Sequence, residues 1–91
     1  DLHKEYRRAA SDVYKRQDQV VETSFLEARH QLLEIAALFD RLDAAAAREG
    51  HGPGGSGAAK CAVLREAIAA LADERPPRDR TVTLLELFAK V

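Results

Sequence analysis

The longest apolar pattern in the chain runs through residues 20–48, where apolar side chains recur at the spacing of an α-helix. This segment contains no glycine or proline and is rich in Ala, Leu, Glu and Arg, which favour helices. A stripe as wide as this one predicts contact with two helices, or with one helix and a second subunit, and we expect it to form the core. The stripe comprises Val21, Phe25, Ala28, Leu32, Ile35, Ala36, Phe39 and Leu42.

A second helix is predicted over residues 57–75, after a segment that holds all five glycines. That segment, residues 50–57, has the composition of a flexible linker. Gly50 suits the end of the first helix and Ser56 the N-cap of the second. The second helix should end at Pro76, because proline lacks the amide proton and disfavours helical geometry in the residue before it. The face that we expect it to bury comprises Cys61, Leu64, Ala67, Ile68 and Leu71.

A short third helix is predicted from about Leu84, because Thr83 and Glu86 have the spacing of a capping box. No alternating strand pattern occurs. The sequence therefore predicts an all-α fold, in which residues 20–48 and 57–75 form an antiparallel helical hairpin covered by the third helix. The chain stops inside an apolar segment at Val91, so we expect a truncated three-helix bundle.

The first 17 residues differ from the rest in charge. They carry five Lys or Arg against three acidic residues, whereas residues 18–91 carry nine against twelve. Residues 12–17 can be encoded as GAT GTG TAT AAG AGA CAG, which resembles the transposon mosaic end used as a sequencing adapter. We therefore expect residues 1–17 to be a non-native extension whose only regular structure would be a helix. Residues 18–91 are expected to form a single domain.

Charge and composition favour no particular ligand. The formal net charge is −1, so no overall field attracts nucleic acid or an anionic membrane. The single Cys61 cannot form an intramolecular disulfide, and no apolar run approaches the length of a membrane span. We expect a cytoplasmic protein with no membrane partner and no cofactor.

The sharpest chemical pattern is a glutamate and a histidine at Glu-x-x-His spacing on the first helix, followed by a second glutamate one turn later. Carboxylate-bridged metal bundles use this spacing, with ligands that point into the bundle. Glu27, His30 and Glu34 instead fall opposite the apolar stripe, and Glu66 falls opposite the apolar face of the second helix. A carboxylate-histidine metal site at Glu27 and His30, with Glu34, is therefore an alternative and not the main prediction.

Two further patterns are weak. The glycine-rich segment lacks the lysine and the preceding strand of a phosphate-binding loop. Arg75, Arg78 and Arg80 form a basic cluster, but acidic neighbours dilute it and the third helix offers leucines where a recognition helix presents polar groups. A nucleic-acid-binding helical module is thus a second alternative.

No arrangement of residues predicts catalysis. Cys61 lies on an apolar face, and neither His30 nor His51 is placed by the sequence to activate it. We expect no enzymatic activity. A chain this small has a marginal core, and such domains often gain stability from a partner. The sequence therefore predicts a small protein-interaction or regulatory module that binds a protein partner or a second copy. Its expected interaction surface comprises Leu26, Leu33 and Leu38.

Overall fold

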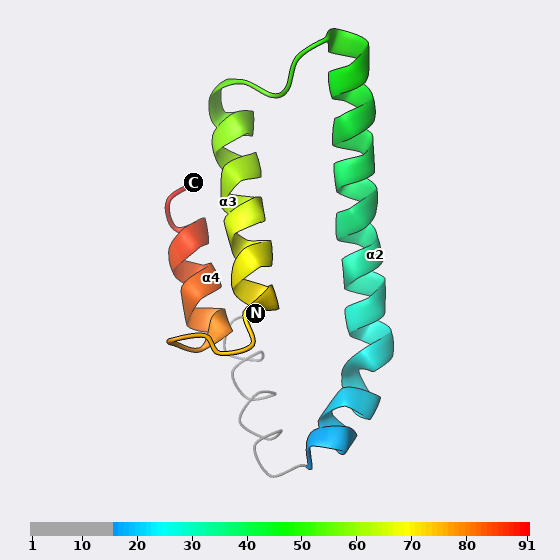
Figure 1. The fold of residues 1–91 in the computed structure, drawn as a ribbon, viewed down its shortest axis with the longest axis vertical. Coiled ribbons are helices and arrows are strands. Elements are labelled where there is room, and N and C mark those ends of the chain that lie inside the picture. Colours follow the sequence, from blue (N-terminus) through cyan, green and yellow to red (C-terminus); the bar gives the residue numbers. More distant parts are fainter. Residues whose placement is uncertain (1–15) are drawn as a thin grey trace. The chain divides into compact units, whose positions relative to one another are not determined.

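The computed structural model describes residues 16–91, and their regular structure is entirely helical (Figure 1). No strand occurs within residues 16–91, so the predicted all-α class is confirmed for this part of the chain. No helix in the same range is both long enough and apolar enough to cross a membrane. The helices are α2 (Gln17–Glu49), α3 (Gly55–Ala72) and α4 (Arg80–Phe88).

The chain divides into two compact units, Asp1–Leu42 and Asp43–Val91, so the boundary falls inside α2. The first unit contributes most of α2, and the second contributes the end of α2 together with α3 and α4. The predicted extension at residues 1–17 and its adapter-like part at residues 12–17 lie outside the described residues, except for the last two positions.

The first helix begins three residues earlier than the sequence predicts, at Gln17 instead of Val20. The Arg16 carbonyl accepts the first helical hydrogen bond from the Val20 amide at 3.0 Å, which makes Arg16 the N-cap. The Gln19 side chain accepts a hydrogen bond from the Arg16 amide at 3.1 Å. This contact is the reciprocal half of a capping box, and it satisfies a backbone donor that the helix itself leaves open.

The linker between α2 and α3 is shorter than predicted. Gly50 adopts a φ of 81° and its amide donates back into the last turn of α2 at 2.8 Å, which confirms its role at the helix end. The next helix begins at Gly55 instead of residue 57, with Gly54 as the N-cap and no side-chain capping bond. The predicted capping role of Ser56 is therefore wrong, because Ser56 already lies inside α3.

The turn after α3 is organised by Asp73, the C-cap residue. The helix ends at Ala72, ahead of the prolines that were expected to end it. The Asp73 carboxylate accepts a hydrogen bond from the Arg75 amide at 2.9 Å, which offers the backbone a turn in place of another helical bond. The Arg80 guanidinium donates to the Asp73 carbonyl, and thus ties the start of α4 to the end of α3.

The third helix starts at Arg80, four residues before the predicted start at Leu84. Asp79 is its N-cap, and the Asp79 carbonyl accepts the Thr83 amide at 3.2 Å. Thr83 is therefore an interior residue of α4. The predicted capping box between Thr83 and Glu86 is wrong. The Glu86 amide lies beyond the first turn of α4, so it is not one of the amides at the helix start that need a side-chain acceptor.

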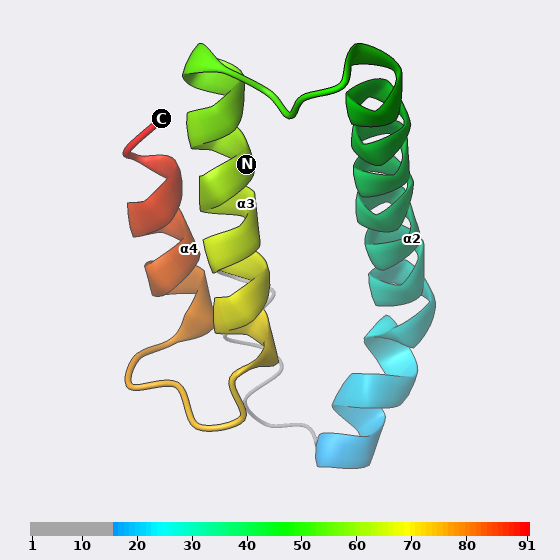
Figure 2. The same cartoon turned by 45° about the horizontal axis from the view of Figure 1, so that its top comes forward.

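The buried core of the described residues lies between α3 and α4. These two helices pack side by side and antiparallel (Figures 1 and 2). Only Val63, 7% exposed, and Ala67, 4% exposed, are buried there. The sequence analysis predicted that Ala67 is buried but missed Val63. It placed the centre of the buried face of α3 about one residue further round the helix than the structure does. Ile68 and Leu71, which were expected to be buried, are exposed. The α4 residues that are half-buried and apolar or hydroxylated are Thr83, Leu84 and Leu87.

The apolar stripe of α2 is exposed, contrary to the expectation that it forms the core. No residue of α2 is buried among the described residues, and Phe25 is 57% exposed. Leu32 and Ile35 are exposed too, and only Phe39 and Leu42 of the larger side chains in the stripe are half-buried. The amphipathic pattern indicates which face of α2 is apolar, but it does not identify the helix or molecule that covers this face.

The buried position Val63 and the exposed position Val21 allow a matched stability test. We expect Val63→Ala to lower the free energy of unfolding of the α3–α4 pair by roughly 1 to 2 kcal/mol, because it removes buried methyl groups and leaves a small cavity. Val21→Ala should leave that stability unchanged, since its side chain is exposed. Denaturant titrations followed through the amide resonances of α3 measure both variants. Equal losses in the two variants would contradict this core.

Candidate functional site

The three predicted interaction residues all lie on α2 and are all exposed. The exposed fractions are 76% for Leu26, 52% for Leu33 and 39% for Leu38. Leu26 and Leu33 are seven residues apart and share one flank of the apolar stripe, whereas Leu38 lies on the other flank. The structure thus leaves these side chains accessible but does not gather them into one patch.

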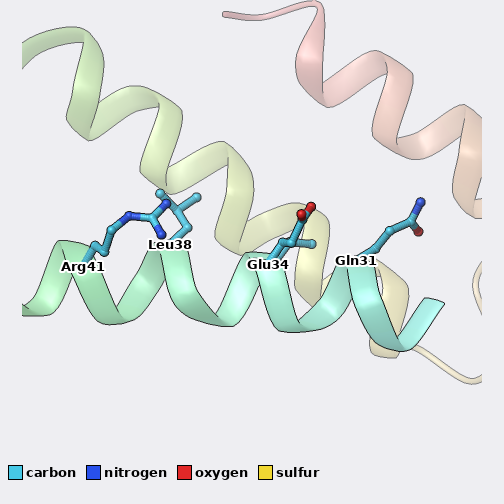
Figure 3. A pocket seen from close by; sticks show the side chains of 5 residues that line it. Gln31, Glu34, Leu38 and Arg41 are labelled. Carbon is cyan, nitrogen blue, oxygen red and sulfur yellow. The ribbon is translucent and has the colours of Figure 1, made fainter. Parts of the chain in front are cut away.

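The surroundings of Leu33 and Leu38 differ. Leu33 borders an apolar depression on α2 that continues the stripe, and the other residues lining it are Phe25, Ala28, Arg29, Leu32 and Ala36. Leu38 borders a second depression, whose other lining residues are Gln31, Glu34, Ile35 and Arg41. Figure 3 shows Gln31, Glu34, Leu38 and Arg41 projecting from the same side of α2. Leu33 therefore extends an apolar surface, whereas Leu38 and Ile35 lie beside three polar side chains.

The polar residues of the metal alternative are on the solvent-facing side of α2. His30 Nε2 lies 3.2 Å from Glu34 Oε1, and the two side chains are 70% and 69% exposed. A pair one turn apart at the surface of a helix contributes only a few tenths of a kcal/mol. Glu27 is exposed on the same helix and Glu66 is exposed on α3. Within residues 16–91, no three His, Cys, Asp or Glu side chains are grouped so that they could hold a metal ion.

Cys61 is a free, half-buried thiol on α3. The sequence predicted it on the buried face of this helix, and in the structure it is only half-buried, while Val63 and Ala67 are the buried residues of α3. His51, the histidine nearest to it in sequence, lies in the linker, where its Nδ1 is 2.8 Å from the carbonyl oxygen of Gly52. That short contact engages His51 with its own backbone.

The basic cluster before α4 makes contacts within the chain. Arg78 donates two hydrogen bonds to the Glu86 carboxylate, one from Nη1 to Oε1 at 3.0 Å and one from Nη2 to Oε2. This forked pairing joins the turn before α4 to the last turn of α4. Arg80 is engaged by the Asp73 carbonyl, as described above. Two of the three guanidinium groups in the cluster therefore stabilise the turn between α3 and α4.

The Arg78–Glu86 pair shifts the titration of both groups. The hydrogen bonds from Arg78, and then its charge, hold the pKa of the Glu86 carboxyl below its ordinary value. The same contact raises the pKa of Arg78. Sequence reasoning missed this pair because it assigned Glu86 to a capping box. The sequence signal that could have identified this pair is the opposite charge of Arg78 and Glu86, which lie on either side of the start of α4.

The lowered pKa of Glu86 predicts a pH-dependent contribution to stability. The Glu86 carboxylate contributes fully above the ordinary glutamate pKa, and the contribution is lost as the pH falls through the depressed pKa of Glu86. We therefore expect Glu86→Gln to lower Tm near neutral pH and to match the native Tm in acid. Thermal unfolding across a pH series measures this, with Glu66→Gln on α3 as an exposed control. A Tm difference that persists unchanged into acid would contradict the pairing.

The exposed apolar surface of α2 is the feature of residues 16–91 that most resembles a functional site. Its large side chains lie on a regular helix, whereas the polar groups that could carry chemistry are dispersed or engaged in turns. Comparison of the chain with protein-family models, with curated proteins and with solved structures found no match.

Proposed function

We propose that the chain is a small helical protein-interaction module with no catalytic site of its own, and that α2 carries its binding surface. The observation that carries the proposal is the exposure of large apolar side chains along one helix. Phe25, Leu26, Leu32 and Leu33 are each more than half exposed. Fully burying one such side chain is worth about 1.5 to 3 kcal/mol, so a partner that covers several of them gains substantial binding free energy.

The length of α2 supports the same proposal. Most of the stability of a helix in a protein comes from packing of its apolar face, and an isolated helix in water is marginal even with favourable residues. α2 runs for 33 residues without a buried side chain among those described. A contiguous exposed apolar surface on a regular element is typical of an interaction site.

The proposed surface includes both flanks of the stripe. In the antiparallel hairpin that the sequence predicts, residues 57–75 return along residues 20–48 and cover the centre of the stripe. That arrangement is part of the proposal, and it leaves Leu26, Leu33 and Leu38 at the edges for a partner. The proposal therefore does not depend on whether the centre is covered from within the chain. A cytoplasmic location is also proposed, because the single cysteine cannot form a disulfide within the chain.

Site-specific photo-cross-linking tests this function. A photoreactive phenylalanine analogue at Leu33 should form covalent adducts with protein, whereas the same analogue at Thr23, on the polar side of α2, should not. The Leu33 adducts should disappear when Leu26→Glu places a charge on the same flank, because binding would then bury an unpaired carboxylate.

Two outcomes contradict the proposed function. One is the absence of adducts from Leu33 in cells that express the chain. The other is equal labelling from Leu33 and Thr23, which indicates random collision instead of binding. The mass of a specific adduct identifies whether the partner is another protein or a second copy.

A further inference from the structure

One side of α2, on the Leu26 and Leu33 flank of the stripe, forms a single exposed row with acidic residues at both ends. Successive members of this row are three or four residues apart, so they lie next to one another along one side of the helix. Every member of the row is exposed. The row, called the flank row below, comprises Asp18, Glu22, Leu26, Arg29, Leu33, Ala36, Asp40 and Asp43.

The middle of the flank row is apolar and adjoins a depression in α2. Leu26 is 76% exposed and Leu33 is 52% exposed. Leu33 and Ala36 line the depression together with Phe25 and Leu32 of the stripe. A partner that covers these side chains gains free energy from burial of apolar surface. Burial alone does not select the partner, so the charges around the apolar part determine which partners fit.

The acidic ends of the flank row belong to a wider charge imbalance in α2. The helix carries seven Asp or Glu against three Arg, which is a net charge of −4 with its histidine neutral. Residues 50–91 carry six Lys or Arg against five acidic residues, so the excess negative charge is concentrated in α2. Four of the seven acidic residues of α2 lie in the flank row, together with one basic residue, Arg29. The negative charge therefore lies beside the apolar surface.

Most of these carboxylates are not neutralised by the described part of the chain. Asp18 has a basic neighbour, because its Oδ1 lies 3.3 Å from Arg16 Nε. Glu22, Asp40 and Asp43 form no salt bridge with a side chain of residues 16–91. A basic group from a partner can therefore approach these three carboxylates without displacing an ion pair within residues 16–91.

We infer that the flank row docks an amphipathic helix of a different protein, which has apolar side chains at its centre and Lys or Arg near both ends. The inference rests on the proposed function, and it names the chemistry of the partner. Glu22 and Asp40 are 18 residues apart, about 27 Å along α2, so the partner helix is at least that long. The partner position opposite Arg29 is acidic or polar, since a basic one would be repelled there.

A helix is the element that fits this row. The side chains of two helices interlock as ridges and grooves, and at a small crossing angle they remain in contact over several turns. Binding of an amphipathic helix through apolar anchors three or four residues apart is a common mode of peptide recognition. The straight row between Glu22 and Asp40 presents its anchors, Leu26 and Leu33, at that kind of spacing.

The charge order of the flank row disfavours a second copy. Acidic residues lie at both ends, so full overlap of two such rows sets acid against acid in either orientation. In an antiparallel pair Glu22 faces Asp40 of the second copy, and in a parallel pair each of these residues faces its own equivalent. Facing like charges destabilise a helix pair. Nucleic acid and anionic lipid surfaces are disfavoured for the same reason, because both are negatively charged.

Two synthetic peptides test the charge order. The first is an amphipathic helix of about 25 residues, with leucines along one face, lysines near both ends and a glutamate beside its centre. The second has the same sequence with every lysine and glutamate exchanged. In fluorescence anisotropy titrations with the full chain at low salt, the first peptide should bind about tenfold more tightly, because its charges complement those of the flank row. Added salt should reduce this difference.

Charge reversal on the chain tests where the peptide binds. Glu22→Lys combined with Asp40→Lys should abolish the preference for the first peptide, because both ends of the row then repel its lysines. Glu27→Lys combined with Glu49→Lys is the matched control. It makes the same change in net charge outside the flank row, and it should keep the native preference. Circular dichroism checks that both variants retain the helix content of the native chain.

The outcomes separate this inference from the proposed function. Equal affinity for the two peptides, or no binding of the first peptide at concentrations up to about 1 mM, overturns the inference. A preference that survives the reversal at Glu22 and Asp40 also overturns it, as does a Leu33 adduct with the mass of a second copy. In each case the proposed function stands if Leu33 still forms specific adducts, so the two failures are distinguishable.

Discussion

The structure depends on one constraint, which is that α2 carries a long apolar face and has no buried side chain among the described residues. Packing of an apolar face supplies most of the stability of a helix in water, and α2 keeps its larger side chains exposed or half-buried. In the α3–α4 pair the apolar face of α3 is covered within the chain, because Val63 and Ala67 pack against the neighbouring helix. The α3–α4 pair therefore has a buried core of its own, whereas α2 has no buried residue among those described.

The polar groups of the chain have structural explanations that match their positions. His30 and Glu34 form an exposed pair along one helix, and Arg78 and Glu86 join a turn to the helix that follows it. Arg80 is engaged by a backbone carbonyl at the end of α3. These contacts set helix boundaries and turns, and the unexplained surface that remains is apolar. The proposed binding function rests on that apolar surface.

The existence of the three helices was predictable from the sequence, whereas their ends and their packing were not. Long runs of good helix formers and the breaks at Gly50 and Pro76 locate the elements. The ends depend on particular contacts, such as Gln19 with the Arg16 amide, and several side chains can compete for that role. Val63 was missed because a helix with apolar residues on several sides has no single face that periodicity can identify. The candidate surface at Leu26, Leu33 and Leu38 was predictable as apolar, but its partner was not, since periodicity describes one helix at a time.

Hydrogen exchange measured at several chain concentrations tests the central claim most directly. The account predicts that the amides of α2 around Leu26 and Leu33 become more protected as the concentration of the chain, or of the protein cross-linked at Leu33, rises, because binding covers this flank of the helix and stabilises it. The amides of α3 around Val63 should keep the same protection, since their packing is internal to one chain. Exchange around Leu26 and Leu33 that stays equally fast at every concentration, and in the presence of the protein cross-linked at Leu33, would contradict the account.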